Sequence, residues 1–356
     1  MIGNDKYSNS LRLGLLVPGV FFLSLFSGVS APLGSRGYLS VATIFCAVYI
    51  FAYIVTSLVS VQRNKSIAFM MFIFILLING SPLTTVMLVG FNVGLFFILL
   101  KHVGRPFDRR SENLVFWILL SFLTICTVSV MLDGNSVLWS KYASASVSPF
   151  PVRLKMMFSE PSHLGMFAVA LIFVSKSHRL RVLLFLTLLA SQSFIALLLL
   201  VVLKFHRHPK FLIFFSSVLF SIFIYFTSLS PELFWSNSGA MRLIGVGYLF
   251  QNIDLIGLFL GHGLGAGDIA LTPIFESNGV DQANGFLFST IYDVGLIGMM
   301  LLLYCLCGNK FESFVFAVLL LNFGLGSFIF IVIFLLVKKM SLEAQIVRSK
   351  KDKVCS

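Results

Sequence analysis

Long apolar stretches, separated by short polar segments, follow one another along almost the whole chain. The uninterrupted ones include residues 12–30, 38–61, 114–132, 211–229 and 285–307. Each is close to the ~20 residues that an α-helix needs to cross the hydrocarbon core of a bilayer, and is too long for a strand of a membrane barrel. Because lipid offers no hydrogen-bond partners to an open backbone, these runs predict an all-α bundle of membrane-spanning helices.

Three further apolar regions carry a polar or glycine-containing centre. Residues 66–100 contain INGSP, residues 180–203 contain ASQS, and residues 311–337 contain NFGLGS. Each region has Lys or Arg on both flanks, and since basic flanks stay in the cytoplasm, each is predicted to bend and return as a hairpin. With the segment that follows residue 160 included, the total is about 12 membrane segments. The halves of the last two hairpins, at about 11–13 residues, are short enough to be tilted or re-entrant.

The distribution of charge predicts the orientation of the bundle. Of the 26 Lys and Arg residues, only Arg36, Lys141, Arg153, Lys155 and Arg242 fall outside the proposed inner segments. With both termini in the cytoplasm, residues 1–340 form one membrane domain with large outer loops at 133–159 and 230–284, and residues 341–356 form a basic cytoplasmic tail.

The N-terminal apolar run is predicted to be a retained helix rather than a signal peptide. Pro32 follows directly after the small residues VSA, and a proline at that position disfavours cleavage.

Composition excludes a soluble globular protein. Hydrophobic residues make up 58% of the chain, charged residues make up 11%, and the mean hydropathy is +0.97. The net charge of +12 is explained by membrane orientation and does not indicate nucleic acid. The sequence has no phosphate-binding loop, no dinucleotide fingerprint and no Cys and His cluster with zinc spacing, so the chain itself is not expected to use ATP.

A polar cluster marks the point at which the first outer loop returns to the membrane, in RLKMMFSEPSHLGMF, residues 153–167. Pro161 suits the first turn of a helix, with Ser159 or Glu160 as its cap. On a purely structural interpretation, these polar residues only begin a helix at the level of the lipid headgroups.

A functional interpretation gains weight because outer cations are scarce. Arg153, Lys155 and Arg242 all lie in the two large loops. Guanidinium groups are permanently charged and bind phosphate oxygens in bidentate fashion, so the arginines are candidates for holding a diphosphate. Glu160 is the candidate general base. His163, three residues later on the same helix face, either orients that carboxylate, acts as the base itself or lies at headgroup level.

Glycines occupy alternate positions of the second outer loop, in LGHGLGAGDIA. This spacing allows tight turns and close approach to a ligand, but without a preceding strand it does not predict a nucleotide cradle. His262 is expected to make local hydrogen bonds rather than bind a metal. Asp293 lies about two to three turns inside the next membrane segment, where an ionisable group indicates either function or a bond to a neighbouring helix. The candidate substrate-binding residues here are His262, Gly263, Gly265, Asn284 and Asp293.

In combination, these pieces resemble the O-antigen polymerase family, the Wzy-type enzymes, within the wider polymerase and ligase superfamily. The resemblance rests on FSEPSHLG at the start of a membrane segment, the arginine of SGAMRL, the following GHGLGAG, and NGFLFSTIYDVGLIG at the next helix, and it extends to LLASQS. It covers residues 150–300, and the rest of the chain is similar in hydropathy only.

The resemblance implies a GT-C-like, metal-independent, inverting glycosyltransferase of lipopolysaccharide biosynthesis in the bacterial inner membrane. Such an enzyme joins oligosaccharide repeats carried on undecaprenyl pyrophosphate at the periplasmic face, without a cofactor and beside a chain-length regulator. Applied to this sequence, Arg153, Glu160 and Arg242 would be catalytic, and Lys155 and His163 would bind substrate. The expected partners are the lipid-linked oligosaccharide and the bilayer, and not nucleic acid.

Two other functions remain open. Ligases of the superfamily have a histidine directly before the asparagine that opens the late helix, and Ala283 stands there in QANGF, which favours a polymerase. Phe194 stands where some relatives have arginine, which argues against a third phosphate-binding residue at that bend. A flippase or transporter of lipid-linked sugars would be expected to show repeated halves. The sequence contains no such repeat, although the short hairpins suit a transporter.

Overall fold

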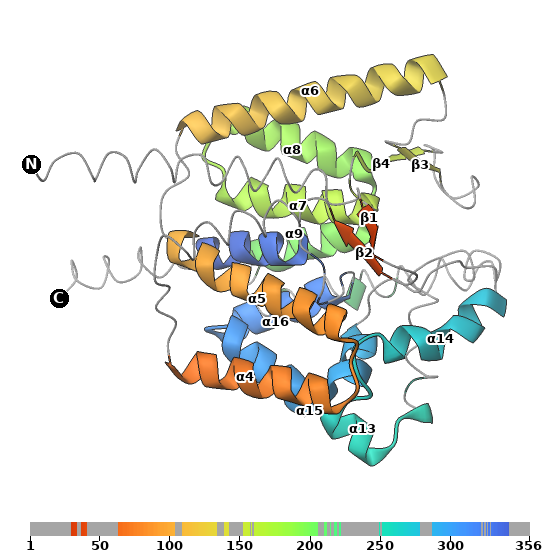
Figure 1. The fold of residues 1–356 in the computed structure, drawn as a ribbon. Coiled ribbons are helices and arrows are strands. Elements are labelled where there is room, and N and C mark those ends of the chain that lie inside the picture. The colour runs from red at the N-terminus through yellow and green to blue at the C-terminus, as the bar shows by residue number, and fades with distance from the viewer. Residues whose placement is uncertain are drawn as a thin grey trace, which may run out of the picture. The chain divides into compact units, whose positions relative to one another are not determined.

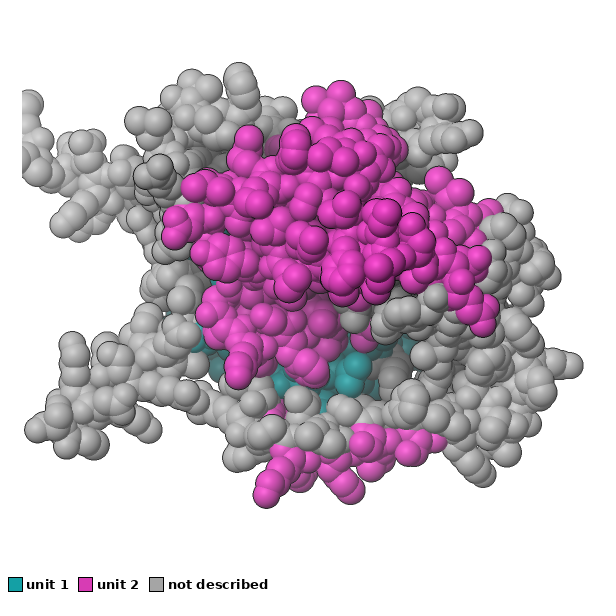
Figure 2. Space-filling view, turned by 90° about the horizontal axis from the view of Figure 1, so that it is seen from below, with its two compact units in different colours: residues 1–58, 95–203, 331–356 teal, residues 59–94, 204–330 magenta. Residues whose placement is uncertain are grey.

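The computed structural model describes residues 30–33, 37–40, 63–103, 109–133, 139–141, 152–156, 158, 160–205, 210–211, 214, 217–218, 221, 249, 251–277, 287–321, 323, 325, 327 and 329–341. These residues are predominantly α-helical (Figure 1), which confirms the predicted all-α class. The chain divides into two compact units, shown in separate colours in Figure 2. Unit 1 comprises residues 1–58, 95–203 and 331–356, and unit 2 comprises residues 59–94 and 204–330.

Unit 1 is built around a helix that is buried on nearly all sides. α7 (Pro161–Val174) packs along α8 (His178–Ser191), and α8 also contacts α6 (Arg109–Asp133). α8 buries Leu180, Leu184 and Leu188 at the four-residue spacing of one helix face. After a two-residue break the chain continues as α9 (Phe194–Phe205), whose residues up to 203 belong to this unit.

The C-terminal helical residues of unit 1 pack on the end of α5 (Leu83–Val103), whose residues from 95 onward belong to this unit. The Phe96 ring stacks on Phe334 with centroids 5.6 Å apart, and Lys338 Nζ lies 5.6 Å from the Phe96 centroid. Stacked aromatic pairs and cation–π contacts of this kind stabilise a helix pair beyond simple burial.

Unit 2 is organised by α15 (Leu287–Leu306). α4 (Arg63–Ile78), α13 (Leu255–Leu260), α14 (Ala266–Ser277) and α16 (Lys310–Leu320) all contact it. α15 is not continuous, because Gly295 has φ 70° and ψ 171°. A residue in that conformation cannot continue an α-helix, so α15 consists of two helical pieces on either side of Gly295.

The described residues also include two small antiparallel ribbons. β1 (Ser30–Leu33) pairs with β2 (Gly37–Ser40), and β3 (Trp139–Lys141) pairs with β4 (Val152–Leu154). The first ribbon occupies the junction between the apolar runs 12–30 and 38–61, so strand replaces predicted helix at residue 30 and at residues 38–40. The second ribbon lies in residues 133–159, the predicted outer loop, where the sequence did not predict strands.

The three predicted helix breaks are confirmed. A turn at Asn79–Pro82 separates α4 from α5, Gln192 and Ser193 separate α8 from α9, and α16 ends at Leu320 before the NFGLGS segment. Two described helical windows, Glu112–Ser129 and Ser289–Leu306, are long and apolar enough to cross a membrane. The apolar runs 12–30, 38–61 and 211–229 fall mostly outside the described residues.

Candidate functional site

Arg153 joins the first polar cluster to the break between α8 and α9. It lies on β4, and its Nε and Nη2 atoms donate to the backbone carbonyls of Ser191, at 3.2 Å, and Gln192, at 3.3 Å. Gln192 ends α8 in the left-handed conformation, with φ 47°. The last carbonyls of a helix lack intrahelical donors and carry partial negative charge, so a guanidinium is well suited to bind them.

Glu160 is the N-cap of α7, with Pro161 in the first helical position. Glu160 is one of the two caps that the sequence allowed, but its carboxylate accepts no hydrogen bond from the backbone of the first turn. It accepts instead from the Ser162 hydroxyl, at 2.9 Å. His163 follows in the same turn and is half-buried. The acid is therefore held by a side chain rather than by the helix terminus.

Gly165 allows α7 to approach the α8–α9 break closely. A Cβ atom at this position would lie 2.6 Å from the Ser191 Oγ, 2.9 Å from the Ala196 Cβ and 3.2 Å from the Ser193 Cβ. Only glycine fits without displacing these groups. The motifs SEPSHLG and ASQS, with Arg153 beside them, therefore form one packed cluster, which we call the α7–α8 cluster.

Asp293 is the centre of a second cluster, in unit 2. Its side chain is 8% exposed. Oδ2 accepts from the Gly265 amide at 2.9 Å, and Oδ1 accepts from the Gly267 amide at 2.7 Å. These amides stand at the N-terminus of α14, where a carboxylate is favoured. Of the two roles that the sequence allowed for Asp293, this contact is the bond to a neighbouring helix.

Residues 261–267, which we call the glycine turn, are held to their surroundings through backbone atoms. The amide of Leu264 donates to Ser81 Oγ at 2.8 Å. Gly263 has φ 96°, and a Cβ there would lie 2.7 Å from the Asn79 carbonyl oxygen. Gly265 also has a positive φ, of 86°. The alternating glycines are therefore required by backbone conformation and by close backbone approach.

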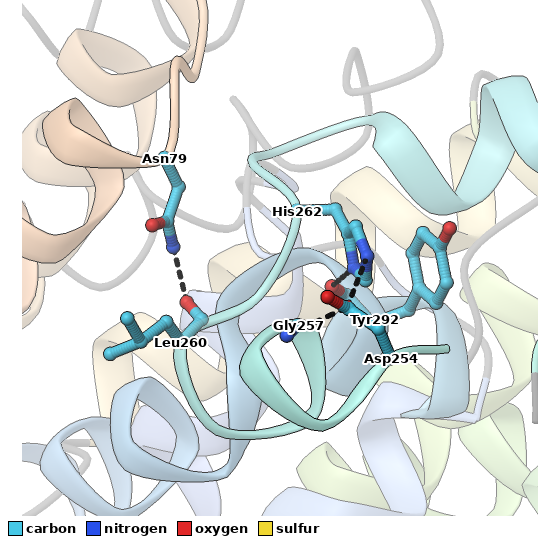
Figure 3. Close-up of polar contacts among 6 residues, drawn as sticks. All are labelled: Asn79, Asp254, Gly257, Leu260, His262 and Tyr292. Carbon is cyan, nitrogen blue, oxygen red and sulfur yellow. Dashed lines mark hydrogen bonds and ion pairs between the residues drawn. The ribbon is translucent and has the colours of Figure 1, made fainter. Parts of the chain in front are cut away.

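His262 makes the local contacts that the sequence favoured for it (Figure 3). Its Nε2 lies 3.2 Å from an Asp254 carboxylate oxygen, and its ring stacks on Tyr292 with centroids 4.2 Å apart. Asp254 also accepts from the Gly257 amide and so caps α13. Among the residues that the structure describes, no three His, Cys, Asp or Glu side chains are grouped to hold a metal ion.

Asp268 lies beside this cluster, in the first turn of α14, and accepts from the Ser289 hydroxyl at 3.3 Å. Although its side chain remains exposed, partial desolvation by the surrounding protein raises the pKa of its carboxyl, and the Ser289 hydrogen bond opposes that shift.

The remaining candidates are placed only in part. Lys155 is half-buried directly after β4. Arg242 and Asn284 lie outside the described residues. The α7–α8 cluster belongs to unit 1, and the Asp293 cluster belongs to unit 2.

Glu112 is a buried carboxylate that the sequence analysis did not single out. It accepts from the Ser175 hydroxyl at 3.3 Å, from the Ser177 amide at 3.0 Å and from the Lys176 amide. Because these partners are more than sixty positions away, only its place in the first turn of an apolar helix could have drawn attention to it. It ties α6 to the turn between α7 and α8.

Comparison of the chain with protein-family models, with curated proteins and with solved structures finds no match. The α7–α8 cluster contains an arginine, a carboxylic acid and two helix termini. An arginine can bind an anion, and a carboxylic acid can exchange protons.

Proposed function

We propose that this protein is a membrane glycosyltransferase of the O-antigen polymerase type, which joins oligosaccharide repeats carried on undecaprenyl pyrophosphate. One observation carries the proposal. The arginine and acid of RLKMMFSEP lie in the same packed cluster as the ASQS break, 38 residues away from Arg153. RLKMMFSEP and ASQS, two of the segments that carry the resemblance, are thus neighbours in space although they are far apart in the sequence.

The proposed reaction uses Glu160 as general base and the arginines as the anion-binding groups. Glu160 takes the proton of a hydroxyl at the non-reducing end of one lipid-linked repeat. The hydroxyl oxygen then bonds to the anomeric carbon of the growing chain, and the bond from that carbon to the diphosphate breaks. The diphosphate leaves with the electron pair, and Arg153 and Arg242, assisted by Lys155, stabilise its charge. A single displacement inverts the anomeric configuration.

The proposed setting is the bacterial inner membrane. About 12 segments would cross or enter the bilayer, with both termini in the cytoplasm and the reaction at the periplasmic face. The scarcity of cations in the two outer loops supports this orientation. A separate chain-length regulator would set the length of the polymer.

The proposal is tested by the polymer that cells make. Arg153→Ala and Arg242→Ala should each leave single repeats and abolish the ladder of long polymer, because the leaving diphosphate loses its counter-charge. Lys141→Ala is the matched control, since it removes one cation from the same predicted outer loop as Arg153 at a residue to which the proposed reaction gives no role. Polymer of normal length in either arginine variant, with the protein present in membranes at the normal level, would contradict the assignment.

A flippase for lipid-linked sugars is the second candidate, and the break of α15 at Gly295 favours it. Discontinuous helices in the membrane are typical of transporters, where they bind the substrate. The two functions differ in a simple way, since a flippase moves lipid-linked sugar across the bilayer and leaves its length unchanged. A ligase, the third candidate, would transfer finished polymer to lipid A core.

A further inference from the structure

α13 has the reverse of the burial pattern expected in a soluble protein. Its one buried residue is Gly257, whereas Leu255 and Ile256 are 73% and 69% exposed and Phe259 is 45% exposed. The packing of the glycine is tight, because a Cβ there would lie 1.9 Å from the His262 Cε1. A helix that packs through its smallest residue and turns its large apolar side chains outward is typical of contact with lipid.

The position of α13 along α15 points the same way. Directly after α13, the amide of His262 donates to the Tyr292 carbonyl, and the amide of Gly263 donates to the Asp293 carbonyl, both at 2.9 Å. These carbonyls lie inside Ser289–Leu306, one of the windows that are long and apolar enough to span a membrane. The end of α13 therefore lies within the length of this window, about one helical turn from its start and just before the break at Gly295.

An exposed apolar surface continues from α13 onto α4. The side-chain amide of Asn79 donates to the Leu260 carbonyl and joins the end of α4 to the end of α13 (Figure 3). Just before Asn79, the side chains of Phe74, Leu77 and Ile78 are exposed. Both helices belong to unit 2, and together they present apolar side chains on either side of this link.

The backbone of the turn after α13 meets the condition that hydrocarbon imposes on non-helical chain. Such chain is tolerated at membrane depth where its polar groups are bound by protein. The amides of His262 and Gly263 are bound by α15, the amide of Leu264 by Ser81, and the amides of Gly265 and Gly267 by Asp293. The turn can therefore lie in the membrane without unbound amides at these positions.

We propose that α13 and the glycine turn form a re-entrant element, with Leu255, Ile256 and Phe259 lying among the acyl chains of the bilayer. The charge pattern placed residues 230–284 in a single aqueous loop, and this inference removes residues 255–267 from it. It goes beyond the proposed function, because it holds equally for a polymerase, a ligase or a transporter.

Site-specific photo-crosslinking in the full-length chain tests the inference. The photoreactive residue p-benzoylphenylalanine is introduced singly at Ile256, at Met300 and at Gln251, and the protein is placed in vesicles of phosphatidylethanolamine and phosphatidylglycerol. Met300 is 61% exposed on α15 and serves as the lipid-facing standard. Gln251 is exposed shortly before α13 and serves as the aqueous standard. After irradiation, mass spectrometry identifies covalent phospholipid adducts.

We expect phospholipid adducts at Ile256 and Met300, with a yield at Ile256 at least fivefold above that at Gln251. A yield at Ile256 equal to that at Gln251 would overturn the inference, and so would a cross-link from Ile256 to a second protein chain in place of lipid. Phe259 provides a second position if the substitution at Ile256 prevents folding. Because Met300 reports membrane insertion independently, loss of the adduct at Ile256 alone leaves the proposed function standing.

Discussion

Replacement of Gly295 by alanine tests how α13 is joined to α15. Gly295 has φ 70° and ψ 171°, a conformation that is nearly exclusive to glycine and costs another residue about 1–3 kcal/mol. A Cβ at this position would also lie 2.3 Å from the Phe259 carbonyl oxygen and 2.5 Å from the Gly261 amide nitrogen. Both are backbone atoms, so the backbone at the end of α13 and the backbone of α15 must move apart to make room.

The two costs add to a large destabilisation. Forcing extra volume into a packed contact costs typically 1–3 kcal/mol, so Gly295→Ala should lower the free energy of unfolding by roughly 2–6 kcal/mol. Gly261→Ala should behave similarly, since a Cβ there would lie 2.3 Å from the Asp293 carbonyl oxygen. Because the two glycines face the same contact, the double variant should be less destabilised than the sum of the single ones.

Two other glycines separate these contributions. Gly80 has φ 70° with no atom within 4 Å of its Cβ position, so Gly80→Ala should cost about 1–2 kcal/mol for conformation alone. Gly94 lies inside α5 with open space around it, so Gly94→Ala should be neutral or stabilising by about 0.5–1 kcal/mol.

The assay is thermal unfolding of the purified variants in detergent, followed by the monodisperse fraction that remains after heating. The expected order of stability is Gly94→Ala, then Gly80→Ala, then Gly295→Ala. If Gly295→Ala unfolds at the same temperature as Gly94→Ala, the break in α15 and its contact with α13 are not as described.

Four further outcomes are expected from the carboxylates and from Arg153. Asp293→Asn should lower the free energy of unfolding by about 1.5–3 kcal/mol, because a side-chain amide has one oxygen in place of the two that accept the backbone bonds. Asp268→Asn should change the stability much less, and unfolding in detergent compares the two variants. Because the pKa of Asp268 is raised in the folded protein, its charged carboxylate lowers the free energy of unfolding at pH values above that pKa. This destabilisation decreases as the pH falls, and it is absent below the ordinary pKa of an aspartate. Any stability advantage of Asp268→Asn at neutral pH should therefore disappear in acid, and an advantage that grows there would contradict the assignment. Glu112→Gln should lower the free energy of unfolding by about 1–3 kcal/mol, and proteolysis between α7 and α8 should become faster. A variant as resistant to protease as the native chain would contradict the role of Glu112 in holding this turn to α6. Arg153→Lys should unfold at lower temperature than Lys155→Arg, because an ammonium group cannot reproduce the two parallel bonds, and equal midpoints would show that the guanidinium fork is not needed.

The helices and their breaks were predictable because both depend on local composition. The polar centres INGSP and ASQS interrupt otherwise apolar runs, and the chain turns at each of them. Pro161 marks the start of α7 because proline is favoured in the first helical turn. In these places the sequence a few residues on either side determines the structure.

The contacts that build the two clusters could not be predicted, because they join residues far apart in the chain. Arg153 binds carbonyls 38 and 39 positions later, and Asp293 binds amides 26 and 28 positions earlier. Backbone carbonyls and amides carry no side-chain signal that a sequence pattern could detect. α13 was missed for another reason, since its apolar run of six residues is too short to stand out in the loop 230–284.

The central claim, that the protein lengthens lipid-linked sugar chains, is tested most directly by reconstitution. Purified protein in liposomes receives undecaprenyl pyrophosphate-linked repeats from the outside, and the lipid-linked products are sized by gel electrophoresis. A polymerase should yield products of two, three and more repeats without any repeat reaching the liposome lumen, and Arg153→Ala should yield none. Repeats that cross the bilayer while remaining single would contradict it and identify a flippase.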